Sequence, residues 1–225
     1  MENKQTLWIF GDSFSTPFNN KTLGTWDSEY CKWKGYVPKY FGTILSEELG
    51  LNVKHCGIGG VGNDTIFDVV LKQAPNICKG DIVIIGWSNI GRFRLASKEN
   101  KFQTVIPNFI DTSLKMFDTI SKSTLEEILV NRDNELYKKE LYIKVEFLNF
   151  LFKDMQLIQW TPFNYDGTKI FGFKNVNSII METNRELQDG HYSEIGHRDI
   201  SKEFITILNN DKLRNDNNKL YMHLI

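Results

Sequence analysis

The sequence contains the stretch Leu7-Trp8-Ile9-Phe10-Gly11-Asp12-Ser13-Phe14-Ser15, on which the fold prediction rests. Its first part is a continuous apolar run, which stops abruptly at the turn signal that begins with Gly11. Such a pattern is typical of a central strand in a parallel sheet, whose two faces are both covered. Ligands of open α/β sheets bind at the carboxyl ends of the strands, so Ser13 is a candidate nucleophile by position and by type. The simpler alternative is that Asp12 and Ser13 only cap the next element.

The rest of the chain alternates between apolar runs and helical patterns. Further strands are predicted at 51–56, 81–86 and 157–161, and helices at 38–49, 66–72, 109–130, 134–153 and 194–209, with Ser193 as the N-cap of the last helix. The segments 16–35 and 163–181 are predicted to be long loops. This order predicts an α/β fold with a central parallel sheet and helices on both of its faces. We expect a single domain over residues 1–225, with a helical insertion at about 92–154 that serves as a lid or an oligomer contact.

Composition and charge narrow the functional classes. The chain has 225 residues, of which 41% are hydrophobic and 24% charged, and its formal net charge of -1 does not favour nucleic acid or an anionic membrane as a partner. No apolar run approaches the length of a membrane span. The three cysteines, Cys31, Cys56 and Cys78, lack metal-type spacing and are expected to be reduced thiols. The first residues do not resemble a signal peptide, so we expect a cytoplasmic protein, with a place in a virus particle as the alternative.

Four predicted loops at strand ends carry residues that suit ester hydrolysis. This reaction needs a nucleophile, a base that takes its proton, and donors for the oxyanion. We predict Ser13 as the nucleophile, His191 as the base, and Asp189 as the group that orients the histidine. The backbone N–H of Gly60 and the side-chain amide of Asn89 are predicted to hold the oxyanion, together with the N–H of Ser13. No histidine, cysteine and carboxylate cluster has metal-ligand spacing, so neither a metal nor another cofactor is predicted.

These residues resemble the sequence blocks of the SGNH hydrolases, the GDSL-type esterase and lipase superfamily. The similar blocks are Gly11-Asp12-Ser13-Phe14-Ser15, His55-Cys56-Gly57-Ile58-Gly59-Gly60, Gly86-Trp87-Ser88-Asn89 and Asp189-Gly190-His191. The last block is followed by Ser193 and Gly196-His197, and with these residues the blocks follow the family's order and span residues 11–197. The resemblance implies a flavodoxin-like three-layer α/β/α fold and a serine esterase that needs no cofactor. It also implies a substrate among O-acetylated carbohydrates, lipids, acyl thioesters and simple esters.

The chain departs from the family pattern at three places. His55 stands where an asparagine is common, and Asn89 lies between Ser88 and an isoleucine without the usual aspartate. The acid Asp189 precedes His191 by two residues, whereas the family usually has three, and Gln188 occupies that usual position. The sequence therefore leaves open whether the site is a triad or a Ser–His pair.

Two patterns in the second loop have competing interpretations. The tripeptide Gly62-Asn63-Asp64 resembles the family's third block, but it follows no separate strand and is predicted to start a helix. The run from Gly57 through Gly59 to Gly62 matches a dinucleotide-binding fingerprint. The next strand, however, ends in a glycine at residue 86 without the acid that such a fold needs.

Three functional hypotheses follow from the sequence. The first is a serine esterase that removes a small acyl group, such as acetyl on a carbohydrate. Aromatic side chains in and next to the loop 16–35 would present a wall to the sugar or acyl group: Phe18, Trp26, Tyr30, Trp33 and Tyr36. Packing over the core is the alternative role for these aromatics. The second hypothesis is a non-catalytic glycan-binding module on the same fold, and the third is a structural component of a phage particle. His55, His197 and His223 are not assigned to the chemistry; His197 is expected on a face of the last helix.

Overall fold

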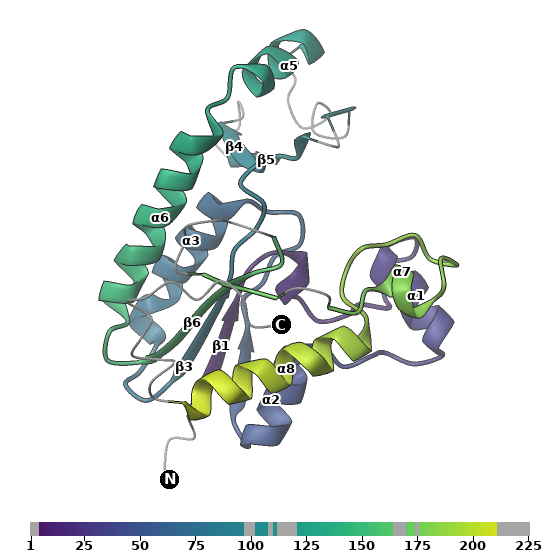
Figure 1. Cartoon of the computed structure of the whole chain (residues 1–225), viewed down its shortest axis with the longest axis vertical. Helices are drawn as coiled ribbons and strands as arrows, with labels where there is room; N and C mark the ends of the chain where they lie inside the picture. Colours follow the sequence, from purple (N-terminus) through teal and green to yellow (C-terminus); the bar gives the residue numbers. More distant parts are fainter. Residues whose placement is uncertain are drawn as a thin grey trace.

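A parallel β-sheet forms the centre of the molecule. The computed structural model describes residues 5–96, 102–107, 110–111, 121–163, 170–173 and 176–210. In this part the sheet has the order β2-β1-β3-β6-β7 (Figure 1), with β1 at Thr6–Phe10, β2 at Asn52–His55, β3 at Ile82–Gly86, β6 at Gln156–Thr161 and β7 at Phe171–Gly172. Each neighbouring pair is parallel, and Leu7 of β1 lies beside Val53 on one side and Ile82 on the other. The four longer strands confirm the strands predicted from the apolar runs.

The apolar runs are continuous because both faces of the sheet are covered. Successive side chains of a strand point to opposite faces. Leu7 and Ile9 therefore belong to one buried cluster, whereas Trp8 and Phe10 belong to a second cluster on the other face. All five residues of β3 are buried.

Two pairs of helices cover these faces (Figure 1). Helices α2, Phe41–Leu49, and α8, Glu194–Asn209, pack on the face of Leu7 and Ile9, and helices α3, Asn63–Gln73, and α6, Asn134–Leu151, pack on the face of Trp8 and Phe10. The predicted bounds of the last helix are confirmed, and its N-cap Ser193 accepts a hydrogen bond from the N–H of Gly196. The sheet flanked by helices on both sides confirms the predicted α/β class.

The two predicted loops contain short helices and a strand. Helix α1, Trp26–Lys34, lies within 16–35 and ends at Gly35, whose φ of 77° suits a glycine. The sequence prediction was wrong here because aromatic and charged residues are mixed along this segment and form no clear apolar stripe. Strand β7 and helix α7, Ile179–Glu182, lie within 163–181.

The insertion begins with a β-hairpin that the sequence analysis did not predict. Strands β4, Phe93–Ala96, and β5, Phe102–Val105, pair antiparallel, and helix α5, Lys122–Val130, follows. The predicted helix 109–130 is thus confirmed at its C-terminal end, while residues 108–109 and 112–120 lie outside the described residues. Phe93, Val105 and Leu125 form a small core of their own, far from the sheet (Figure 1).

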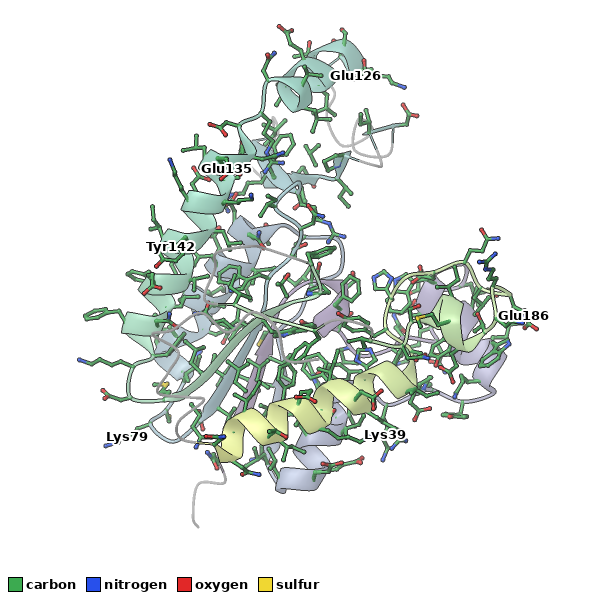
Figure 2. The ribbon with its side chains drawn as sticks, in the orientation of Figure 1. Lys39, Lys79, Glu126, Glu135, Tyr142 and Glu186 are labelled. Atoms are coloured by element: carbon green, nitrogen blue, oxygen red, sulfur yellow. The ribbon has the colours of Figure 1, made fainter. Side chains whose placement is uncertain are left out.

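Helix α6 has two apolar faces. Its inner face buries Leu141, Val145 and Leu148, with Phe152 just beyond its end. On the outer side, Leu136, Ile143, Phe147 and Phe150 are between 45% and 70% exposed. Figure 2 shows Glu135 and Tyr142 on this outer side, and Glu126 at the far end on α5. An oligomer contact through the insertion stays a prediction. Within the described residues, none of the helices combines the length and the apolar character that crossing a bilayer requires.

Candidate active site

The parallel strands bring the predicted site residues to one edge of the sheet. Ser13 follows β1, Gly60 follows β2, Asn89 follows β3, and Asp189 and His191 precede α8. Ser13 opens a short 3₁₀ turn, Ser13–Ser15, and the carboxylate of the preceding aspartate accepts a hydrogen bond from the N–H of Phe14. The capping interpretation of Asp12 is therefore confirmed, and it leaves the Ser13 side chain at the end of the strand.

Ser13, His191 and Asp189 form a continuous hydrogen-bonded chain. The Oγ of Ser13 lies 2.8 Å from Nε2 of His191, and Nδ1 of His191 lies 2.6 Å from Oδ1 of Asp189. The same Oδ1 accepts the backbone N–H of His191 at 2.8 Å. The two-residue spacing thus lets Asp189 close an Asx turn onto the residue that it orients. The structure brings the acid to the histidine despite its departure from the family spacing.

The Asp189 carboxyl group is stabilised in its charged form. Burial by itself disfavours the carboxylate, but the hydrogen bonds and the charge of His191 outweigh this effect and hold the pKa of Asp189 below its ordinary value. Asp189 is therefore a carboxylate at neutral pH. An aspartate in this state fixes the tautomer of the histidine, since Nδ1 carries the proton and Nε2 can accept one from Ser13.

The ring of His191 lies between two aromatic rings. Trp26, at the start of α1, stacks on one face with a centroid distance of 3.9 Å and an interplanar angle of 4°. Phe14 stacks on the imidazole at 4.6 Å. Of the other aromatics predicted as a wall, Phe18 and Tyr30 are buried in the core, whereas Trp33 and Tyr36 are exposed. The sequence analysis did not assign Trp26 to the histidine; its only signal was an aromatic residue in the segment that follows the nucleophile.

The glycine-rich loop after β2 packs against the Ser13 turn. The N–H of Ile58 donates to the carbonyl of Gly11, and a Cβ on Gly59 would lie 4.0 Å from the Cβ of Ser13. Gly60 has φ of +77°, which an L side chain rarely adopts, and a Cβ there would lie 4.0 Å from Cδ1 of Ile106 on the insertion. The loop therefore brings the backbone of Gly59 and Gly60, which carry no side chains, to Ser13.

Asn89 and Asn63 organise the loop after β3. The Oδ1 of Asn89 accepts the N–H of Gly91 at 2.6 Å, so its NH2 group is the end that remains for donation to a ligand. Asn63 is the first residue of α3, which confirms the predicted helix start at Gly62-Asn63-Asp64, and its Oδ1 accepts the N–H of Ser88 at 2.7 Å.

Two of the remaining histidines, His55 and His197, contact aromatic side chains. His197 is on α8, as predicted, but on its buried face, where Phe18, Tyr40, Phe41 and Tyr192 surround its ring. His55 contacts the hydroxyl of Tyr40 through Nδ1. His223 lies outside the described residues.

The buried His197 should make the stability of the protein fall on mild acidification. Burial lowers the pKa of His197 to about 3, so the folded chain keeps this ring neutral between about pH 6.5 and 3, where the unfolded chain binds a proton. The free energy of unfolding should therefore fall by about 1.4 kcal/mol per pH unit in this window through His197 alone. Urea unfolding of the wild type and of His197→Leu at several pH values measures this slope. The variant should be flatter by that amount, and parallel curves would contradict the assignment.

Comparisons with known proteins add no further evidence. The chain matches no protein-family model, and a search of curated proteins finds no relative.

Among the residues that the structure describes, no three His, Cys, Asp or Glu side chains gather in a way that could hold a metal ion. The candidate site therefore rests on the geometry of this chain.

Proposed function

We propose that the protein is a serine esterase of the SGNH type that hydrolyses esters of small acyl groups. The observation that carries this proposal is the hydrogen-bonded chain from Ser13 Oγ through His191 to Asp189. The strand order supports it, because β2-β1-β3-β6-β7 corresponds to the doubly wound order 2-1-3-4-5 of flavodoxin-like folds, whose ligands bind at this edge.

The proposed reaction follows from the positions of these groups. Ser13 Oγ attacks the ester carbonyl while its proton moves to Nε2 of His191, and Asp189 stabilises the imidazolium that forms. The N–H groups of Ser13 and Gly60 and the amide of Asn89 hold the oxyanion. The intermediate then collapses, and the leaving alcohol takes the proton from Nε2. Water attacks the acyl-enzyme with His191 as the base, which releases the carboxylic acid and restores Ser13.

The proposed substrate is a small acyl ester, such as an O-acetyl group on a carbohydrate. Ile106 borders the glycine loop at Gly60, and an aliphatic side chain at this place would limit the length of the acyl group. p-Nitrophenyl acetate, butyrate and octanoate, assayed side by side, test this preference. The alternative of a glycan-binding module was motivated by the altered acid spacing and by the helical insertion, and the contact between Asp189 and His191 weakens the first of these two grounds.

Labelling with a fluorophosphonate probe tests the proposed function, because this reagent reacts with an activated serine and not with an inert hydroxyl. We expect a single adduct, which peptide mass spectrometry places on Ser13, and no adduct on Ser13→Ala. Ser15→Ala is the matched control, since Ser15 lies in the same turn, is fully buried, and its Oγ has no hydrogen-bond partner among the described residues. This control should be labelled as the wild type is. A folded wild type that takes no label, or a label that persists in Ser13→Ala, would overturn the proposal.

A further inference from the structure

One arginine side chain joins three of the four loops that carry the candidate catalytic groups, those with Ser13, Gly60 and Asn89. The Nη1 of Arg92 lies 3.0 Å from Oδ2 of Asp12, 3.0 Å from Oγ of Ser88 and 3.3 Å from the carbonyl oxygen of Val61. Each of these three partners is the immediate sequence neighbour of a proposed catalytic group, because Asp12 precedes Ser13, Val61 follows Gly60, and Ser88 precedes Asn89. A single guanidinium thus contacts the chain next to the nucleophile and next to both sources of oxyanion donors.

The contacts of Arg92 are shielded from water. Asp12 is 1% exposed and Ser88 is fully buried, whereas 16% of the Arg92 side chain is exposed. Ser88 Oγ also donates to Oδ2 of Asp12 at 2.8 Å, so the side chains of Asp12, Ser88 and Arg92 all contact one another. Burial raises the pKa of Asp12, and Arg92 is the strongest of the groups that lower it. Removing the guanidinium would leave a buried carboxyl group without its counter-charge, which is costly and favours rearrangement of the loops.

The backbone of Arg92 also contacts two of these loops, those with Asn89 and Gly62. The N–H of Arg92 donates to the carbonyl of Asn89 at 3.0 Å, so the arginine closes the turn that carries the candidate oxyanion donor. A Cβ on Gly62 would lie 3.0 Å from the carbonyl oxygen of Arg92. The glycine therefore lets the second loop approach the arginine closely, which a larger residue at this position would obstruct.

We propose that Arg92 is a positioning residue that sets the geometry of the oxyanion hole relative to Ser13, by fixing Asp12, Val61 and Ser88 to one rigid group. Arg92 acts through these neighbours and does not touch the substrate. All three contacts go to Nη1, which the planar guanidinium carries at a fixed position, whereas the ammonium of a lysine ends a flexible chain of different length. This proposal rests on the proposed esterase function and adds a residue that the sequence blocks do not contain.

Variants of Arg92 test the proposal by separating kcat from KM. In p-nitrophenyl acetate hydrolysis, Arg92→Met should lower kcat by roughly 10²-fold, comparable to the loss of one oxyanion donor, and leave KM within about twofold. Arg92→Lys keeps the charge but not the planar group that fixes Nη1 in place, and should lose about tenfold in kcat. The control is Arg94→Met, which removes an arginine that pairs with Asp68 on α3 and should keep the wild-type kcat.

The outcomes also distinguish the two proposals. If the wild type takes no fluorophosphonate label, the esterase function itself fails. If the wild type is labelled and both folded Arg92 variants keep its kcat, only the role of Arg92 fails. Loss of cooperative unfolding in both variants would show a role in stability alone and would overturn the positioning role. If only Arg92→Met fails to fold, the kcat of Arg92→Lys decides.

Discussion

His191→Ala should hydrolyse p-nitrophenyl acetate at least about 10³-fold more slowly than the wild type, and the double variant with Ser13→Ala should be no slower than either single variant. Nε2 of His191 lies 2.8 Å from Ser13 Oγ, and no other group is proposed to accept the proton of the nucleophile. A serine hydroxyl without its base is a weak nucleophile at neutral pH. Because the two side chains act as one unit, removing the second after the first takes away nothing further.

The measurement is the initial rate of all three variants together with the wild type, with circular dichroism as evidence of folding. His55→Gln is the matched control, since His55 lies on the edge strand β2 and contacts Tyr40, and this variant should keep the wild-type rate. Multiplicative losses in the double variant would mean that Ser13 and His191 act independently. A wild-type rate in Ser13→Ala would exclude Ser13 as the nucleophile.

The elements that the sequence predicted best are those whose pattern is set by burial. A strand covered on both faces must be apolar throughout, so β1 and β3 are evident from the sequence. Helix α8 carries its apolar residues at helical spacing and begins at a serine cap, so both ends could be placed. The hairpin of β4 and β5 was missed because its two short strands stand outside the alternation of strands and helices from which the other strands were placed.

The candidate site was predictable in its residue types but not in its contacts. Ser13 and His191 could be chosen because both stand at predicted strand ends and both suit ester chemistry. The stacking of Trp26 on His191 and the contact of Arg92 with Asp12 join segments that are far apart in the sequence. No local sequence pattern predicts contacts of this kind. Such contacts depend on how the loops pack, which the order of strands and helices leaves undetermined.

Asp189→Asn should lower kcat by roughly 10²- to 10⁴-fold while the protein stays folded. The asparagine oxygen can still accept the N–H of His191, so the Asx turn that Asp189 closes at 2.8 Å can persist. The negative charge that stabilises the imidazolium is lost, while the amide oxygen can take the place of Oδ1, which contacts both the backbone N–H and Nδ1 of His191. The size of the loss therefore measures the charge of Asp189, separately from the loop fold.

The same substitution has a consequence for stability that depends on pH. The pKa of Asp189 is held below its ordinary value, so its carboxylate stabilises the folded state above the unfolded pKa of about 4, and this contribution is lost as the pH falls through the folded value. Asp189→Asn should therefore be less stable than the wild type at pH 7, and the difference should shrink below about pH 4.

A neighbouring residue provides the control for the acid spacing. Gln188 stands three residues before His191, where the acid is more usual, and Gln188→Ala should keep the wild-type rate because Asp189 already contacts Nδ1 at 2.6 Å. Kinetics of both variants on p-nitrophenyl acetate, with unfolding curves at pH 7 and pH 3, test this assignment. If Asp189→Asn keeps more than about a third of the wild-type kcat, far above the loss expected for a triad, the site works as a Ser–His pair in which Asp189 only shapes the loop.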